Sequence, residues 1–188
     1  MKHIPVMLEE TLDLLNIHKD GIYIDATLGG GGHSEAILNR LEGGMLLGFD
    51  KDIDAIERTS KRLEPFGSQF QWVHSSYTAL IKTLKEKDIN EVDGVLFDLG
   101  VSSPQFDDAH RGFSYRFDAR LDMRMDQSQS LSAYEVVNTY EPKDLIRVLR
   151  ENGEERYAKR IVELIVEARP VETTFELVEA IKAAIPMK

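Results

Sequence analysis

The chain has 188 residues, enough for one domain or for one domain and part of a second. Hydrophobic residues make up 42% of it, so a packed core can form, yet no apolar run reaches the eighteen residues of a membrane span. The N-terminal Met1-Lys2-His3-Ile4-Pro5 lacks the long apolar stretch of a secretory signal. The absence of cysteine excludes disulfides and thiolate chemistry and fits a cytoplasmic location. A net charge of −10 argues against a general nucleic-acid coat protein.

The charge is unevenly distributed along the chain. Residues 1–108 hold 10 Lys and Arg against 19 Asp and Glu, whereas residues 109–188 hold 13 against 14. Four arginines cluster at the start of the less acidic part: Arg111, Arg116, Arg120 and Arg124. They either meet a polyanion or pair with the interleaved acids Asp118, Asp122 and Asp126.

The first part of the chain alternates between strand and helix patterns. Apolar spacing and its breaks predict helices over 6–15, 33–41, 52–64 and 77–87, and strands over 21–25, 45–49, 70–74 and 92–99. The last strand is mostly apolar, which predicts burial on both faces. Parallel strands joined by right-handed helical crossovers form a doubly wound α/β sheet, and its ligands bind beyond the carboxyl ends of the strands.

Helical patterns replace the strands in the second part. Helices are expected over 134–137, 142–152, 155–168 and 175–185, with Ser132 and Thr174 as helix caps. The sequence therefore predicts two domains, a sheet domain over residues 1–108 and a small all-helical domain over residues 109–188.

A run of four glycines follows the first strand. It reads Asp25-Ala26-Thr27-Leu28-Gly29-Gly30-Gly31-Gly32-His33, and the second strand ends in Asp50. A strand, a glycine turn, a helix and a second strand ending in an acid form the pattern with which open α/β sheets bind an adenine nucleoside. The acid accepts hydrogen bonds from the ribose hydroxyls. Asp98 and the 74–77 segment lie at two further strand ends, so we expect a shared site.

The details of the glycine turn favour S-adenosylmethionine over a dinucleotide. In Gly-x-Gly-x-x-Gly, the third glycine would fall at Ser34 or at Glu35, and no lysine follows for a phosphate loop. Asp25 would repel a pyrophosphate but suits the ammonium group of S-adenosylmethionine. The backbone amides of 31–33 suit the carboxylate of the same ligand. A dehydrogenase is thus disfavoured, and a turn that binds nothing is the other alternative.

The fourth predicted strand leads into Ser103-Pro104-Gln105-Phe106, a loose variant of the polar-Pro-Pro-aromatic motif of amino-methylating transferases. A base amine is a poor nucleophile, because its lone pair is delocalised into the ring. Asp98 or a carbonyl near Ser103 would accept its N–H hydrogens, and Phe106 would stack on the base. No metal is required. A rigid Pro104 turn that ends a core strand is the alternative.

Together these segments resemble the MraW (RsmH) family, S-adenosylmethionine-dependent bacterial enzymes that methylate cytosine N4 in 16S ribosomal RNA. The matching stretches are His3-Ile4-Pro5-Val6-Met7, 25–34, 49–52, 98–105, Arg111-Gly112-Phe113-Ser114, 121–126 and Gly153-Glu154-Glu155-Arg156. The resemblance implies the following cofactor contacts: Gly31, Gly32 and His33 at the methionine end, Asp50 at the ribose, Tyr77 near the adenine, and Asp98 and Gln105 completing the pocket.

The resemblance also implies an rRNA or small-subunit substrate that the helical domain recognises, for which Phe106, Arg111 and Arg124 are the candidate contacts. Chains of the family continue past Lys188, so strands five to seven would be missing and one sheet edge would be open, a feature compatible with a homodimer. Both a fragment and a naturally truncated relative fit this pattern. A non-catalytic cofactor- or RNA-binding module is therefore the alternative function.

Overall fold

The computed structural model describes residues 5–185 of the chain. Residues 1–4 and 186–188 lie outside the described part, and with them the start of the His3-Ile4-Pro5-Val6-Met7 stretch. The chain forms two compact units, one up to Gly100 and one from Val101 onward. The expected boundary at 108/109 falls inside the second unit, so the segment around Ser103 is part of the helical unit.

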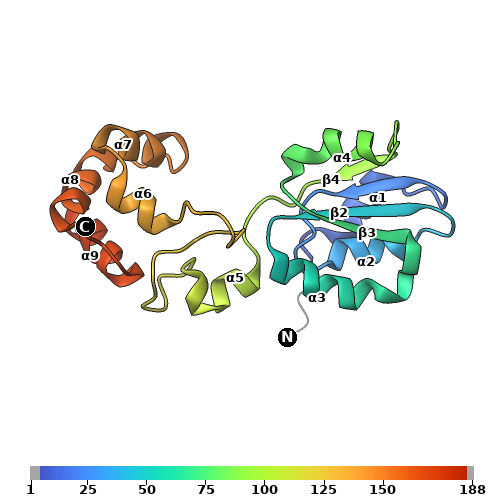
Figure 1. Cartoon of the computed structure of the whole chain (residues 1–188), viewed down its shortest axis with the longest axis horizontal. Coiled ribbons are helices and arrows are strands. Elements are labelled where there is room, and N and C mark those ends of the chain that lie inside the picture. Colours follow the sequence, from blue (N-terminus) through green and yellow to red (C-terminus); the bar gives the residue numbers. More distant parts are fainter. Residues whose placement is uncertain (1–4, 186–188) are drawn as a thin grey trace. The chain divides into compact units, whose positions relative to one another are not determined.

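The first unit is built on a four-stranded parallel sheet with the order β3-β2-β1-β4 (Figure 1). Its strands are β1 (Ile22–Asp25), β2 (Met45–Asp50), β3 (Phe70–His74) and β4 (Gly94–Leu96). In register, Ile24 lies opposite Leu47, and Asp50 lies opposite His74. The predicted α/β class is confirmed, and all four strands end at the same edge of the sheet.

Helices cover the two faces of the sheet unequally (Figure 1). The helices are α1 (Leu8–Leu15), α2 (Gly32–Leu38), α3 (Ile53–Leu63) and α4 (Leu80–Glu86), with short 3-10 turns over 64–69 and 77–79. Leu12, Ile37 and Ile56, from α1, α2 and α3, share one buried cluster with Leu46 of the sheet. On the other face Ile24, Leu47 and Phe49 form a smaller cluster with partly buried residues of α4.

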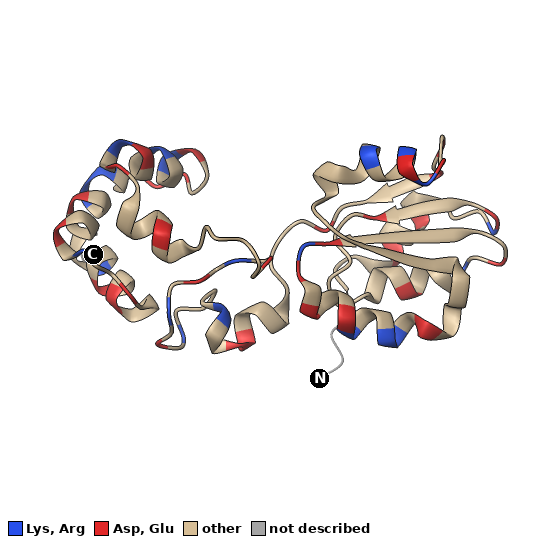
Figure 2. Ribbon diagram, in the orientation of Figure 1, with Lys and Arg blue, Asp and Glu red and all other residues tan. Residues whose placement is uncertain are grey.

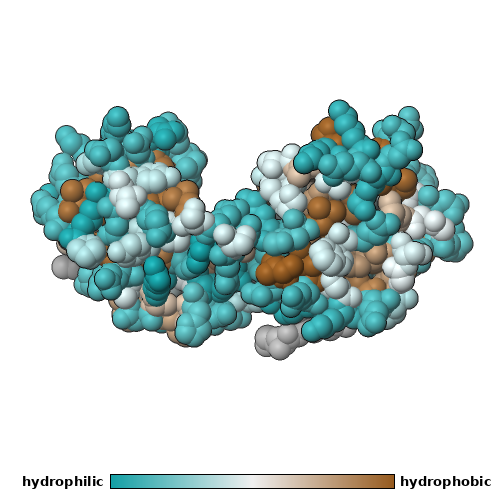
Figure 3. Space-filling model, in the orientation of Figure 1, coloured by the Kyte–Doolittle hydropathy of each residue, from teal (hydrophilic) through white to brown (hydrophobic). Residues whose placement is uncertain are grey.

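The fourth strand is shorter and more exposed than the sequence predicts. Strand β4 covers only three of the eight residues of 92–99, and it forms an edge of the sheet. Val95, Phe97 and Leu99 alternate along this stretch and are 37%, 48% and 66% exposed. The expectation of a strand buried on both faces is therefore wrong: the side chains of this edge stretch are only partly covered, although Phe97 contacts the ring of Tyr77. Figure 3 shows hydrophobic patches at the surface of this unit.

The second unit is helical, as predicted. Its helices are α5 (Ser103–Asp107), α6 (Ala133–Thr139), α7 (Pro142–Glu151), α8 (Ala158–Ala168) and α9 (Thr174–Ala184), with a 3-10 turn over 109–111. Leu121, Leu145, Ile161 and Val162 belong to its own core. Charged residues of both signs lie on the helices and loops, whereas the strands of the first unit carry few (Figure 2). No helix among residues 5–185 is long and apolar enough to cross a bilayer.

Capping boxes fix the starts of three of these helices. Ser132 caps α6, as predicted, and the Glu135 carboxylate accepts hydrogen bonds from both the amide and the hydroxyl of Ser132. Thr173, and not the predicted Thr174, caps α9, because Glu176 lies three residues after Thr173 and its amide donates to the Thr173 hydroxyl over 3.3 Å. The alternative of a rigid Pro104 turn that ends a core strand is wrong, because Pro104 lies in the first turn of α5.

Candidate functional site

Hydrogen bonds join the ends of the four strands. Beyond β1, the Ala26 amide donates to the Leu96 carbonyl of β4 and the Leu28 amide to the Phe49 carbonyl of β2, each over 2.9 Å. The amide of Ser75, just after β3, donates to the Asp50 carbonyl over 2.9 Å. Four segments that are distant in sequence therefore converge at the carboxyl edge of the sheet, where open α/β sheets bind ligands.

The glycine run forms a tight turn between β1 and α2. Gly29 and Gly31 have φ angles of 48° and 71°, in the left-handed region that glycine adopts without steric cost. A Cβ atom at Gly30 would meet nothing within 4 Å, so the backbone is open to a close approach there. The Cβ of a residue at Gly31 would lie 2.4 Å from the Thr59 methyl group. The turn needs glycine for two reasons, its backbone shape and its close packing on α3.

Asp50 ends β2 beside this turn, and its carboxylate is fixed by the backbone. Its Oδ2 accepts from the Gly29 amide over 2.7 Å, and its Oδ1 accepts from the Asp52 amide over 2.9 Å. A carboxylate offers about four lone-pair sites, so each oxygen keeps one for a ligand. Asp50 is only partly buried. The geometry suits an acceptor for two neighbouring hydroxyl groups.

Asp25 lies behind the turn and is 1% exposed. Its Oδ2 accepts from the Ser34 hydroxyl over 2.6 Å and its Oδ1 from the Thr27 amide over 3.1 Å. Burial raises the pKa of this carboxyl group above its ordinary value, although these two hydrogen bonds act in the opposite direction. This burial favours a role inside the turn over the direct contact with a cofactor ammonium that the sequence predicts.

His33, Asp98 and Tyr77 line the same strand ends. Nε2 of His33 lies 3.1 Å from the Val6 carbonyl oxygen, and its Nδ1 lies 3.8 Å from Oδ2 of Asp98. The Asp98 amide donates to the Thr27 hydroxyl over 2.7 Å, while its side chain is 54% exposed. The ring of Tyr77 meets that of Phe97 edge to face, with centroids 5.5 Å apart. Asp98 is therefore held by its backbone and keeps an accessible carboxylate.

The predicted residues after Asp98 lie in the second unit, on α5. Gln105 is 5% exposed, and its side-chain oxygen accepts from the Ser102 amide over 2.9 Å, which is half of a capping box. Phe106 is 42% exposed. Ser103 and Pro104 form the first turn of the helix. The local role of Gln105 is thus to stabilise α5, and its contact with a cofactor stays a prediction.

Arg111 and Arg124 are engaged within the helical unit. Arg111 is 5% exposed and donates to the Arg124 and Met125 carbonyls over 3.0 and 3.1 Å. Arg124 pairs with Asp122 through Nε and Nη2. Burial raises the pKa of Asp122, but the hydrogen bonds and charge of Arg124 outweigh it and lower the pKa overall. The internal pairing that the sequence left open holds for Arg124, so neither guanidinium favours the predicted substrate contact.

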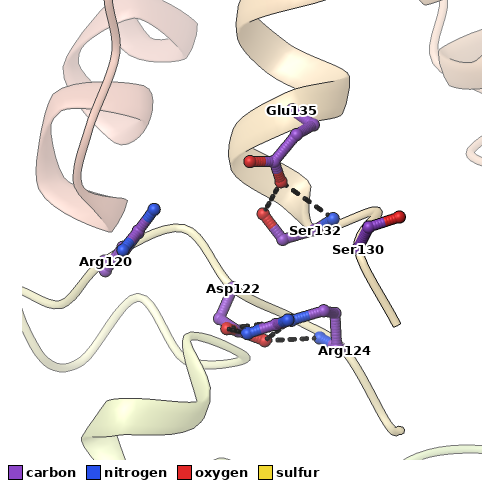
Figure 4. Close-up of a pocket in the computed structure, with 6 residues that line it drawn as sticks. All are labelled: Arg120, Asp122, Arg124, Ser130, Ser132 and Glu135. Carbon is purple, nitrogen blue, oxygen red and sulfur yellow. Dashed lines mark hydrogen bonds and ion pairs between the residues drawn. The ribbon is translucent and has the colours of Figure 1, made fainter. Parts of the chain in front are cut away.

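A polar cavity of about 260 Å³ lies beside this pair (Figure 4). Its lining residues are Arg120, Asp122, Arg124, Ser130, Ser132 and Glu135. The guanidinium of Arg120 stacks over the Tyr134 ring, 5.5 Å from its centroid. Hydrogen bonds from Ser132 lower the pKa of the Glu135 carboxyl group. In the sequence Arg120 belongs to the arginine cluster, but no signal there distinguishes it from the predicted contacts Arg111 and Arg124.

The residues at the strand ends fit S-adenosylmethionine. The open backbone at Gly30 admits a close ligand, and Asp50 offers acceptors for two ribose hydroxyls. Tyr77, 41% exposed, offers an aromatic surface for a purine ring. Asp98 adds an accessible negative charge that suits a cationic ligand. All four features belong to the first unit.

Comparison with known proteins identifies relatives of the whole chain. The ribosomal RNA small subunit methyltransferase H of Mycoplasmopsis agalactiae is 52% identical over 187 residues, which are 100% of this chain and 62% of the relative. The protein of the same name from Lachnospira eligens is 53% identical over 191 residues, 100% of this chain and 61% of the relative. A crystal structure of an rRNA methylase from Streptococcus thermophilus matches with a TM-score of 0.41 and 24% identity, over 53% of this chain and 57% of that one.

The chain thus spans about 62% of the length of the first of these relatives. The sequence profile of the MraW methylase family matches residues 1–188. The chain therefore belongs to the MraW methylase family.

Proposed function

We propose that the protein is an S-adenosylmethionine-dependent methyltransferase that modifies the N4 amine of a cytidine in 16S ribosomal RNA. The observation that carries this proposal is the convergence of the glycine turn, Asp50, Tyr77 and Asp98 at one edge of a parallel sheet. Family membership and relatives that are named ribosomal RNA small subunit methyltransferases support it. The base and its N4 atom are expectations from the resemblance and from the chemistry of the Asp98 segment.

The proposed mechanism rests on binding and orientation. S-Adenosylmethionine, when bound, supplies an electrophilic methyl group on a sulfonium. Asp50 would hold the ribose, and the turn at Gly31–His33 would meet the methionine end. The exposed carboxylate of Asp98 would accept an N–H hydrogen of the base amine, which localises the nitrogen lone pair as the methyl group transfers. A role for Ser103, Pro104 and Phe106 at the base stays a prediction from the sequence motif.

The helical unit is proposed to contact the RNA. Because Arg111 and Arg124 bind neighbouring carbonyls and a carboxylate, the exposed Arg120 at the polar cavity is the better candidate for a phosphate contact. The adjacent hydroxyls of Ser130 and Ser132 and the carboxylate of Glu135 would suit the polar groups of a nucleotide.

Transfer of tritiated methyl groups to small-subunit rRNA tests the proposal. The chain is incubated with labelled S-adenosylmethionine and with small-subunit rRNA or isolated subunits, and the RNA is then digested to nucleosides. We expect label in N4-methylcytidine. Label only in protein, in small amines or in another nucleoside would reject the proposed substrate. Asp98→Asn, which keeps the size of the side chain but removes its charge, should lower the rate by more than it changes cofactor affinity.

A second candidate is the alternative that the sequence left open, a non-catalytic module that binds the cofactor or RNA. This function predicts saturable cofactor binding without turnover. Adding the residues that the relatives carry beyond the matched part would not create activity if it holds. The same addition would create or raise activity if the chain is the main part of an enzyme.

A further inference from the structure

Two side chains of α3 bind the backbone of the glycine turn from behind. The Thr59 hydroxyl donates to the Gly29 carbonyl over 2.7 Å, and Nη1 of Arg62 donates to the Gly30 carbonyl over 2.9 Å. Residues three apart on a helix share a face, so α3 presents both donors together. Thr59 is 1% exposed although it carries a polar group, and its hydroxyl is satisfied by the turn.

The four glycines of the turn have little intrinsic preference for one backbone conformation. Glycine populates many backbone conformations, so a run of four pays a large entropic cost when it is ordered. Contacts from two sides offset this cost. Asp50 accepts from the Gly29 amide on one side, and on the other the methyl group of Thr59 packs against Gly31, where a Cβ atom would come within 2.4 Å.

Arg62 extends this arrangement to α2. Its second terminal nitrogen, Nη2, is hydrogen-bonded and paired with the Glu35 carboxylate, and the Glu35 amide donates to the Gly31 carbonyl over 2.8 Å. The guanidinium thus links α3, the turn and the first turn of α2. Because the peptide bond is trans, a Gly29 carbonyl that faces Thr59 turns the Gly30 amide away from α3.

We infer that Thr59 and Arg62 are positioning residues that hold the glycine turn in the shape that binds the cofactor. This inference rests on the proposed function, since the turn matters for catalysis only if it binds S-adenosylmethionine. Neither side chain belongs to the motifs of the sequence analysis. Both act through the backbone of Gly29 and Gly30 and touch no reacting atom.

The test compares isosteric variants of the full 188-residue chain. Thr59→Val keeps the shape of the side chain and removes its donor, and Arg62→Met removes the hydrogen bonds to the Gly30 carbonyl and to Glu35. Titration calorimetry with S-adenosylhomocysteine should show a Kd about 5- to 10-fold higher for each, as expected because each variant loses one hydrogen bond to the turn. In the ligand-free chain, amide hydrogen exchange at 29–31 should become faster. Thr59→Ser restores the donor and should return the Kd to within about threefold of the wild type.

Ser60→Ala is the matched control, because the Ser60 hydroxyl donates over 2.5 Å to the Ile56 carbonyl within the same helix and not to the turn. All variants are measured well below their unfolding midpoints. Equal Kd values and equal exchange in Thr59→Val and wild type would overturn the inference and leave the proposed function intact. A Ser60→Ala effect as large as that of Thr59→Val would also overturn it. A wild type that binds no cofactor would instead contradict the proposed function, and the positioning role with it.

Discussion

Asp50 illustrates how one side chain can serve both the fold and a ligand. Its two oxygens already accept hydrogen bonds from the Gly29 and Asp52 amides, which fixes the orientation of the carboxylate. Asp50→Asn keeps an acceptor for one amide but removes the charge. We expect cofactor affinity to fall by about 1–3 kcal/mol, the value of charge-assisted hydrogen bonds. Calorimetry measures this directly, with Glu57→Gln, an exposed acid on α3, as the control. Unchanged affinity would contradict the ribose role.

Asp25 makes stability depend on pH. Burial raises its pKa in the folded state, so above the unfolded value of about 3.9 the unfolded chain releases this proton first. The Asp25 contribution to stability is therefore lost as pH rises from there through the folded pKa. Asp25→Asn removes this loss, and Ser34 can still hydrogen-bond to the amide. Urea unfolding at several pH values should show the stability of Asp25→Asn, relative to wild type, rising with pH. A constant or falling difference would contradict the effect of burial.

The position of a single residue can be predicted where it follows from the end of a strand. Asp50, Asp98 and the glycine turn lie at strand ends, and strand ends follow from apolar runs, so the sequence located them. The hydrogen bonds that Arg111 and Arg124 make within the helical unit do not follow from the apolar pattern. A cluster of arginines looks the same whether the guanidinium groups bind carbonyls of their own loop or face a ligand, and only the folded loop decides between these.

At the scale of elements, the bounds of strands follow from local sequence patterns, whereas the burial of a strand depends on contacts with distant parts of the chain. The strands β1, β2 and β3 match their predicted ranges to within a residue. Helix α5 was missed although Ser102 and Gln105 carry the spacing of a capping box, and the same spacing would have identified Thr173 as the cap of α9. The exposure of β4 depends on which element packs against it, and that information is not contained in its own apolar pattern.

The turn at Gly112 is an element whose shape glycine alone permits. Its φ is 69°, and a Cβ atom would lie 2.6 Å from the Arg120 carbonyl oxygen and 2.8 Å from the Asp122 amide nitrogen. Gly112→Ala should cost about 1–3 kcal/mol of unfolding free energy, measured by chemical denaturation. Gly30→Ala provides the contrast, since a Cβ atom there meets nothing within 4 Å, and its stability should stay within about 0.5 kcal/mol of wild type. Equal losses in the two variants would refute this account of Gly112.

At the scale of the whole molecule, two separate cores support the two units. Ile161 is 3% exposed in the core of the helical unit, which shares no residue with the clusters around the sheet. Ile161→Ala should destabilise the helical unit by about 2–5 kcal/mol. Because the proposed cofactor site of the first unit contains no residue of this core, cofactor affinity should stay unchanged. Calorimetric unfolding of Ile161→Ala measures the loss of stability, and cofactor titration of the same preparation measures the affinity. A loss of affinity together with the loss of stability would contradict the independence of the two units.

The central claim is that the strand ends of the sheet bind an adenosyl ligand. Titration of the isotope-labelled chain with S-adenosylhomocysteine, followed by amide chemical shifts, tests it most directly. We predict saturable shifts concentrated at 29–33, at Asp50, at 75–77 and at Asp98, with one common Kd. Shifts that leave these four segments unchanged, or no shifts at all, would contradict the claim.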